Sequence, residues 1–413
     1  MEMHKLGNAI VGQSGGPTAA INATLAGVIR GALKAKEEGK LGTLYGMYHG
    51  IEGALADDLI DLLVLFDHEK ILKDLELTPA AALGSCRKKL PQDPKDPLYD
   101  TLFENFAKND IRYFFYIGGN DSMDTVAKLS RAAALRDYPI IINGVPKTID
   151  NDLAGMDHTP GFGSAAKYIA VTMSEIIADC SVYQIPAVTI VEIMGRDAGW
   201  LTASAGLPWL VSGAGPDYIY LPERAFSLDA FLEDVKGALA KHPNVVIAVS
   251  EGIRDAAGEY VGAMGQTGAV DAFGHKYLAG TAKVLTQFVK DQLDCKVRAI
   301  ELNLPQRCAS HLASATDLAE SSCVGEHAFE MAMEGLTGCV ATIERIAGDE
   351  YAVTYGHHPV AEVANLIKTV PEAFINEEGN GVTDECLSYL LPLIQGERKG
   401  RYVNGLPYHI RLK

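Results

Sequence analysis

The chain has 413 residues, of which 48% are hydrophobic and 22% charged, so it is long enough for two globular domains with sizeable cores. Its formal net charge of −17 argues against general binding to nucleic acid or to a membrane surface. Seven scattered cysteines without a CxxC pair, an N-terminus without an apolar signal-peptide core and the lack of a long apolar run favour a cytoplasmic protein.

The first predicted unit is a strand over residues 8–12 that leads into the turn Gly15-Gly16-Pro17. Apolar residues at helical spacing then predict a helix that ends near Gly39. The turn matches neither GxGxxG nor GxxxxGK[ST], so a dinucleotide site and a Walker-A ATP site both lose support. A phosphate-binding turn and a tight turn that merely needs glycine φ angles both remain open here.

Residues 44–51 are predicted to form a strand and a glycine-rich turn, and a basic run follows at Arg87, Lys88 and Lys89. Such a run is usually a solvated surface. Residues 91–100 are rich in proline and aspartate and are predicted to form a surface loop.

A second glycine turn follows a continuous apolar and aromatic run over residues 111–117, which predicts a buried strand. Gly118 and Gly119 break this strand, and helical spacing resumes over residues 123–135. A glycine turn between a buried strand and a helix exposes backbone N–H groups to a ligand at the positive end of the helix dipole.

The next strand, over residues 140–145, is stopped by Pro146 and followed by one lysine and two aspartates within residues 146–152. Carboxylates at such a turn repel a bare phosphate but suit Mg²⁺, which bridges carboxylate and phosphate oxygens. The two turns therefore predict a metal–phosphate site beside a carboxylate that can act as an acid or base.

The same order of strand, charged turn and helix recurs through the rest of the chain. Strands are predicted over 187–193, 217–221, 245–249 and 297–304, helices over 165–178, 231–241, 281–292 and 312–335, and a strand pair over 340–346 and 351–355. Residues 258–280 are predicted to be loop. The pattern indicates parallel sheets with crossover helices, in two α/β domains that face each other across a cleft.

The turns, taken in order, resemble those of the phosphofructokinase family. The motifs GGNDS, PKTIDND, VEIMGRDAG, PE, SEG and RAIELNLPQR occur in the family's order, and the resemblance covers residues 7–340. It implies the phosphofructokinase fold, with two facing Rossmann-like domains and a C-terminal extension. Residues 1–160 with about 306–360 would form a larger domain that binds the phosphoryl donor, 161–305 a smaller sugar-phosphate domain, and 361–413 the extension.

Two departures point to the pyrophosphate-dependent branch of the family. ATP-dependent members carry glycine where this chain has Asp121 and glycine where it has Lys147. A carboxylate at the first position would repel the nucleotide's α-phosphate, and a lysine at the second would neutralise the phosphates of pyrophosphate. The resemblance thus implies reversible, Mg²⁺-dependent phosphoryl transfer from pyrophosphate to the 1-hydroxyl of fructose 6-phosphate.

The resemblance also implies a role for each motif residue. Asp150 is expected to be the base that takes the proton from the sugar hydroxyl, with charge handled by Lys147 and Arg196. Mg²⁺ is expected near Asn120 and Asp121. Contacts to the phosphoryl donor are expected from Gly15, Gly16, Arg87 and Ser122, and contacts to the sugar phosphate from Thr148, Ile149, Asp150, Asp152, Met194, Gly195, Arg196, Glu251, Arg298 and Arg307.

The sugar's 6-phosphate has fewer expected partners than in ATP-dependent bacterial members. Ala187 replaces an interface arginine, and Leu304 replaces histidine or tyrosine. Arg298 is expected to reach the 6-phosphate across a subunit interface, which implies a homodimer or homotetramer. Tyr183, Lys276 or Tyr277 could substitute for the lost groups, and sedoheptulose 7-phosphate is an additional candidate substrate.

Two further functions remain open at this point. One is an ATP-dependent 6-phosphofructokinase of the same fold, and the other is a non-catalytic regulatory subunit. The intact TIDND and MGR motifs argue against the second.

Overall fold

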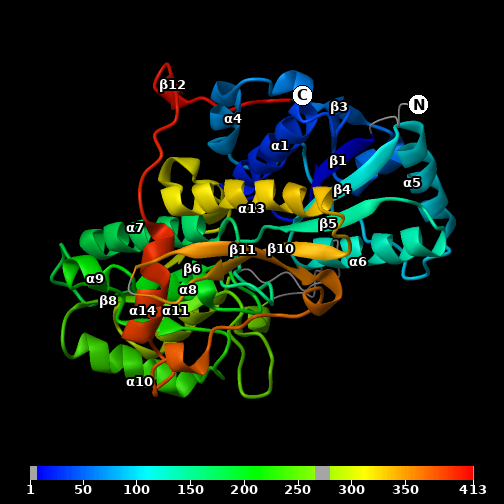
Figure 1. The fold of residues 1–413 in the computed structure, drawn as a ribbon. Helices are drawn as coiled ribbons and strands as arrows, with labels where there is room; N and C mark the ends of the chain where they lie inside the picture. Colours follow the sequence, from blue (N-terminus) through cyan, green and yellow to red (C-terminus); the bar gives the residue numbers. More distant parts are fainter. Residues whose placement is uncertain (1–6, 266–279, 349, 413) are drawn as a thin grey trace, which may run out of the picture.

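The computed structural model of the chain describes residues 7–265, 280–348 and 350–412 (Figure 1). Its first sheet has seven strands in the order β11-β10-β5-β4-β1-β2-β3. The inner strands are parallel, and the edge strands β3 and β11 are antiparallel to their neighbours. The strands are β1 (Asn8–Gln13), β2 (Leu44–Met47), β3 (Leu59–Asp61), β4 (Ile111–Gly118), β5 (Ile141–Pro146), β10 (Cys339–Arg345) and β11 (Val353–Pro359).

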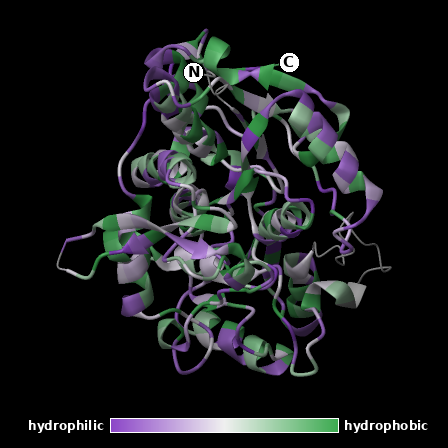
Figure 2. Ribbon diagram, turned by 45° about the vertical axis from the view of Figure 1, so that its right-hand side comes forward, coloured by the Kyte–Doolittle hydropathy of each residue, from purple (hydrophilic) through white to green (hydrophobic). Residues whose placement is uncertain are grey.

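Helices cover both faces of this sheet, because its central strands are apolar on both sides. One face packs on α1 (Ile21–Glu37), α3 (Leu62–Leu65), α4 (Glu69–Glu76) and α13 (Ala315–Met333), and the other on α2 (Ile51–Ala56), α5 (Pro97–Lys108) and α6 (Asn120–Leu135). Figure 2 shows that helices of this molecule carry both hydrophilic and hydrophobic residues, as helices that cover a sheet do.

Helices α1 and α13 lie very close together. A Cβ on Gly27 would lie 1.9 Å from the carbonyl oxygen of Ser322, and one on Gly325 would lie 2.2 Å from that of Thr24. Only glycine fits at these two crossing points. The contact anchors α13, the yellow helix in Figure 1, to the N-terminal half of the chain.

The second sheet has four parallel strands in the order β7-β8-β6-β9. They are β6 (Ala187–Ile193), β7 (Tyr218–Tyr220), β8 (Asn244–Ser250) and β9 (Lys296–Glu301). One face packs on α7 (Phe162–Cys180) and α8 (Trp200–Ala203), the other on α10 (Leu228–Leu239) and α11 (Thr281–Gln292). The short helices α9 (Trp209–Ser212) and α12 (Pro305–Cys308) complete this half.

The C-terminal extension contacts both sheets. Its helix α14 (Asp384–Leu390), with Val370 and Ile375, packs into the core beside β6 and α7. The chain then passes through the small hairpin of β12 (Tyr402–Val403) and β13 (Leu406–Pro407) and returns to the first sheet, as Figure 1 shows. There Ile410 N donates to Thr78 Oγ1 at 2.9 Å.

Short 3₁₀ turns connect several elements: Ser204–Gly206, Val261–Gly265, Ser310–Leu312, Val360–Glu362, Glu372–Phe374 and Leu391–Ile394. No helix in the described part of the chain has the length and apolarity of a membrane span. All seven cysteines are free thiols.

The predicted α/β class with two parallel sheets is confirmed, whereas several predicted element bounds are wrong. Helix α6 begins at Asn120 and not at residue 123, so the polar residues after Gly119 form its first turn. Strand β9 ends at Glu301 and not at residue 304, because Asn303 adopts a positive φ of 48° and Pro305 starts a helix. The predicted loop over 258–280 contains a 3₁₀ turn, and most of the loop lies outside the described residues.

Candidate active site

A cleft of about 770 Å³ lies between the turns at the carboxyl ends of the strands of both sheets. It brings together most of the residues that the sequence singled out. They are Gly15, Gly16, Arg87, Asn120, Asp121, Ser122, Lys147, Thr148, Ile149, Asp150, Asp152, Met194, Arg196, Glu251 and Arg307.

The turn after β1, at Gly15 and Gly16, is bordered by cationic side chains and is called the cradle here. Gly15 has a φ of +77°, and Lys147 Nζ donates to the carbonyl oxygen of Gly16 at 2.6 Å. A Cβ on Gly15 would lie 3.4 Å from Lys147 Nζ, and one on Gly16 would lie 3.1 Å from Arg307 Nη1. Both glycines therefore keep space beside a positive charge, which supports the phosphate-binding interpretation of this turn over the merely structural one.

Lys147 carries its ammonium group into this cradle from a buried position, with only 3% of the residue exposed. Burial lowers the pKa of Lys147 to about 8; Arg307 and Arg87 add to the decrease, and Asp150 and Asp152 oppose it. Burial, with Arg87 close by, also lowers the pKa of Arg307. Cations that depress each other's pKa in this way form a site that favours a multivalent anion.

Asn120 and Asp121 stand in the first turn of α6, whose N-cap is Gly119. The side chain of Asp121 is 44% exposed, and its Oδ1 lies 3.6 Å from Lys89 Nζ. The polar end of α6 thus faces the cleft next to the cradle, where backbone N–H groups attract negative charge.

Two buried oxygens at this end of the cleft lack partners. Asn120 Nδ2 donates to Asp152 Oδ2 at 3.2 Å, but Asn120 Oδ1 and Asp152 Oδ1 are buried and accept no hydrogen bond from any residue that the structure describes. Within the described ranges, no three His, Cys, Asp or Glu side chains form a complete metal cage. A cation held by a few hard oxygens and by water fits this arrangement, which is how Mg²⁺ is usually bound.

Asp150 lines the same cleft. Burial raises its pKa to about 7, with Asp152 and Glu251 adding to the rise and Lys147 and Arg196 opposing it. A carboxylate with a pKa near neutrality is a better proton acceptor for a hydroxyl group than an ordinary aspartate.

The turn that carries Asp150 is held by its own backbone and by the loop that follows. Asn151 has a positive φ of 53°, and its Oδ1 accepts from Thr159 N at 3.1 Å. Thr159 Oγ1 donates to the carbonyl oxygen of Thr148 at 2.9 Å, and Thr148 N donates to that of Pro160 at 3.1 Å. These bonds fix the direction in which the side chains of residues 150 and 152 leave the turn.

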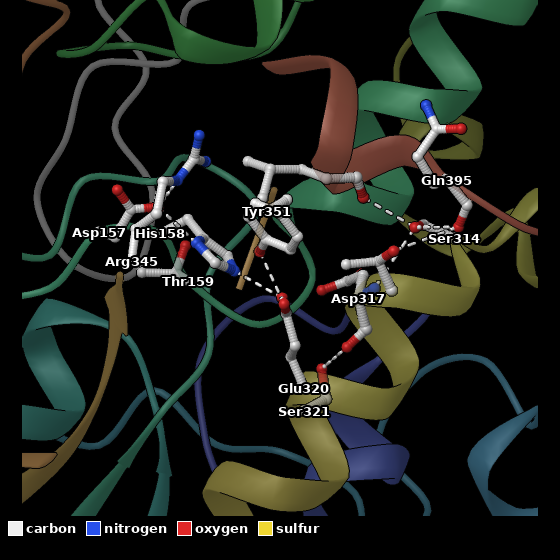
Figure 3. Close-up of polar contacts among 12 residues, drawn as sticks. Asp157, His158, Thr159, Ser314, Asp317, Glu320, Ser321, Arg345, Tyr351 and Gln395 are labelled. Carbon is white, nitrogen blue, oxygen red and sulfur yellow. Dashed lines mark hydrogen bonds and ion pairs between the residues drawn. The ribbon is translucent and has the colours of Figure 1, made fainter. Parts of the chain in front are cut away.

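A buried polar network, shown in Figure 3, ties this loop to α13. His158 lies between Asp157 Oδ2 and Glu320 Oε2, each 2.7 Å from one of its ring nitrogens. Burial lowers the pKa of His158, but its hydrogen bonds to the two carboxylates outweigh burial and raise the pKa above the ordinary value. Tyr351 Oη donates to Glu320 Oε1 at 2.6 Å, and Arg345 Nε lies 3.2 Å from Asp157 Oδ2.

The second sheet contributes the turn after β6. Gly195 has a φ of +133°; its N donates to Glu251 Oε1 at 3.3 Å, and its carbonyl oxygen accepts from Ser250 Oγ at 2.5 Å. Burial raises the pKa of Glu251 to about 7. Arg196 Nε is buried without a hydrogen-bond partner in the described part of the chain. An unpaired donor next to the cleft is able to bind an anion.

Arg298 lies outside the cleft of its own chain. It lines a separate small pocket with Tyr183, next to the exposed side chains of Val182 and Ile185. The expectation that Arg298 acts across a subunit interface stays a prediction. Lys276 and Tyr277 lie outside the described residues.

The cleft also contains residues that sequence reasoning missed: Glu192, Asp197, Glu301, Asn303, Gln306, Asn365 and Ile367. Glu192 and Glu301 are polar residues near the ends of β6 and β9, a signal that was available in the sequence. Gln306 Oε1 accepts from Met194 N at 3.1 Å. Asn365 and Ile367 belong to the C-terminal extension, where neither helical nor strand spacing of apolar residues indicated a functional position.

Comparisons with known proteins agree with the fold described above. A family model described as phosphofructokinase matches residues 8–332. A protein of Halomonas elongata named pyrophosphate–fructose 6-phosphate 1-phosphotransferase is 41% identical over 97% of this chain and 94% of its own length. A protein of the same name from Xanthomonas campestris is 42% identical over 98% and 96%. The crystal structure of pyrophosphate-dependent phosphofructokinase from Nitrosospira multiformis matches with a TM-score of 0.88 and 39% identity, covering 99% of this chain and 97% of that one.

Proposed function

The chain belongs to the phosphofructokinase family, and we propose that it transfers a phosphoryl group reversibly between pyrophosphate and the 1-hydroxyl of fructose 6-phosphate. The products in the forward direction are fructose 1,6-bisphosphate and phosphate. One observation carries this proposal: the buried ammonium of Lys147 closes a glycine cradle that also faces Arg307 and Arg87. Such a site suits a compact anion of high charge.

The proposed reaction assigns a step to each group. Asp150 takes the proton of the sugar 1-hydroxyl, whose oxygen attacks one phosphorus atom of pyrophosphate. The new O–P bond forms as the bridging P–O bond breaks, and the released phosphate stays paired with Lys147. Arg196 offers its unpaired donor to the transferring group, and Glu251 is proposed to hold the sugar's hydroxyls.

Mg²⁺ is proposed to bind at Asn120 Oδ1 and Asp152 Oδ1, the two unpaired buried oxygens, with Asp121 beside them. When bound, the ion would neutralise phosphate charge that the lysine and arginines leave uncompensated. The proposed metal ligands differ from the sequence-based expectation in one respect, because the aspartate that is hydrogen-bonded to Asn120 is Asp152, from the neighbouring turn.

Several finer points belong to the same proposal. The larger domain, residues 1–160 with about 306–360, would bind the donor, and residues 161–305 would bind the sugar phosphate. Sedoheptulose 7-phosphate is proposed as a second acceptor, the active form as a homodimer or homotetramer and the location as cytoplasmic.

Asp121 argues against the ATP-dependent alternative, because its carboxylate faces the donor end of the cleft.

The reaction can be followed by ³¹P NMR on the purified protein with Mg²⁺, pyrophosphate and fructose 6-phosphate. We expect the pyrophosphate signal to fall as signals of fructose 1,6-bisphosphate and phosphate rise one for one, and the reverse conversion when the products are supplied. Stoichiometric phosphate without a new phosphate ester would indicate a pyrophosphatase and would contradict the proposal.

A pH effect follows from Lys147. The ammonium is cationic below its pKa of about 8 and loses its charge as the pH rises through that value. We therefore expect kcat/KM for pyrophosphate, which reports on the free enzyme, to fall above about pH 8. The variant Lys147→Arg should remove this basic limb, because a guanidinium stays charged over the whole range. An active Lys147→Arg enzyme with the same basic limb would assign the limb to another group.

The proposed metal site predicts the effect of a single added charge. Asn120→Asp should lower the Mg²⁺ concentration for half-maximal activity on the order of tenfold, because a second carboxylate beside Asp152 attracts the cation more strongly. Initial rates against free Mg²⁺ measure this, with the exposed Asn404→Asp as the matched control. An unchanged Mg²⁺ dependence would remove Asn120 from the metal site.

A further inference from the structure

Residues 365–370 of the C-terminal extension, here called the strap, are bonded to the turn that carries Asp150. Ile367 pairs with Leu153 in an antiparallel bridge. Lys368 N donates to the carbonyl oxygen of Asp152 at 2.8 Å. The strap therefore lies beside this turn, and its residues Asn365 and Ile367 line the cleft.

The strap is equally bonded to the loop that carries Arg196. The carbonyl oxygen of Lys368 accepts from Trp200 Nε1 at 2.9 Å. Val370 N donates to Glu223 Oε1 at 2.9 Å, and the same oxygen accepts from Gly199 N at 2.8 Å. One short segment therefore joins a catalytic turn of the first sheet to a substrate loop of the second.

The side chain of Lys368 adds charge-assisted hydrogen bonds between the strap and the segment that follows Asp150. Its Nζ donates to the carbonyl oxygens of Asp157 and Met156 at 2.5 and 3.3 Å, and to Asn151 Oδ1 at 3.3 Å. It also lies 5.1 Å from the centre of the Trp200 ring. All three donors of the ammonium are thus used on the segment that follows Asp150. Burial lowers the pKa of Lys368 to about 8, so most of the group keeps its charge at neutral pH.

We propose that Lys368 is a positioning residue for phosphoryl transfer, which fixes the Asp150–Asn151–Asp152 turn against the Arg196 loop. This inference rests on the function proposed above for the cleft. Asn151 stands between the two carboxylates in a left-handed conformation, and Lys368 holds its side-chain oxygen. Without the ammonium, the turn keeps its bonds to Thr159 and Pro160 but loses its side-chain contact with the strap, and the base and Arg196 are then held less closely in one geometry at the reacting atoms.

The variant Lys368→Met keeps the length of the side chain and removes its charge. We expect kcat to fall about 10²-fold while KM for both substrates changes by less than about threefold, because the loss lies in alignment and not in binding. Lys368→Arg should recover most of the lost kcat, since a guanidinium can also donate to the carbonyl oxygens. The matched control is Lys399→Met, the same substitution at an exposed position of the extension.

Hydrogen exchange gives a readout that does not depend on activity. Amides in residues 148–158 should exchange faster in Lys368→Met than in the wild type or Lys399→Met, at a temperature well below unfolding. An unchanged kcat, unchanged exchange, or a loss that Lys368→Arg does not relieve at all would each overturn the positioning role. A wild type without phosphoryl transfer would overturn the proposed function instead, and the exchange comparison would then show whether Lys368 still holds the turn.

Discussion

Asp150→Asn is expected to lower kcat by about 10³- to 10⁴-fold, near the upper end of the range for loss of a general base. The amide has nearly the shape of the carboxylate, so the cleft keeps its form while the proton acceptor is lost. The effect should fall on kcat more than on KM, because the base acts in the transition state. Initial rates with saturating pyrophosphate and fructose 6-phosphate measure it.

Two further observations make the Asp150 result specific. Burial, together with the charges of Asp152 and Glu251, disfavours the ionised carboxylate more than Lys147 and Arg196 favour it, so Asp150→Asn should be at least as stable to heat as the wild type. Asp93→Asn, the same substitution on an exposed loop, should leave kcat unchanged. An Asp150→Asn enzyme that keeps a tenth or more of the wild-type kcat would show that another group removes the proton, and Glu251 would then be the next candidate.

The second large effect concerns the choice of donor. Lys147→Met should lower kcat/KM for pyrophosphate by about 10²- to 10³-fold, because it removes the buried cation next to the leaving phosphate. The double variant Asp121→Gly with Lys147→Gly should lose at least as much activity with pyrophosphate. It should gain more than about tenfold in kcat/KM for ATP, since a carboxylate that repels the nucleotide's phosphate is gone.

The single variants separate the two contributions. Asp121→Gly alone should raise kcat/KM for ATP. Lys147→Met alone should lower kcat/KM for pyrophosphate and leave kcat/KM for ATP no higher than in the wild type. Lys95→Met, on the exposed loop before α5, is the matched control for the loss of a lysine. If the double variant discriminates against ATP as strongly as the wild type does, donor choice depends on other residues of the cleft.

Much of the site could be predicted because its residues follow strands. The runs at 111–117 and 140–145 are mainly apolar, interrupted by Arg112 and Asn143, as is usual for parallel strands that are buried on both faces, and the polar residues after them were therefore expected at one edge of the sheet. The start of α6 was harder to place, because its first turn, Asn120 to Ser122, is polar and carries no apolar periodicity.

Contacts between distant parts of the chain could not be predicted in the same way. Glu320 meets His158 from 162 positions away, and nothing local to either residue indicates the pairing. The strap lacks regular secondary structure, so neither helical nor strand spacing marks Lys368. Burial of Lys147 likewise depends on the packing of the turns around it, although the residue itself was identified from its motif.

The central claim is that pyrophosphate is the phosphoryl donor at this cleft. It is tested most directly by initial rates of fructose 1,6-bisphosphate formation by the purified wild type with Mg²⁺, fructose 6-phosphate and either pyrophosphate or ATP at equal concentrations. We expect rapid turnover with pyrophosphate and little or none with ATP. Faster turnover with ATP than with pyrophosphate would contradict the roles assigned to both Asp121 and Lys147.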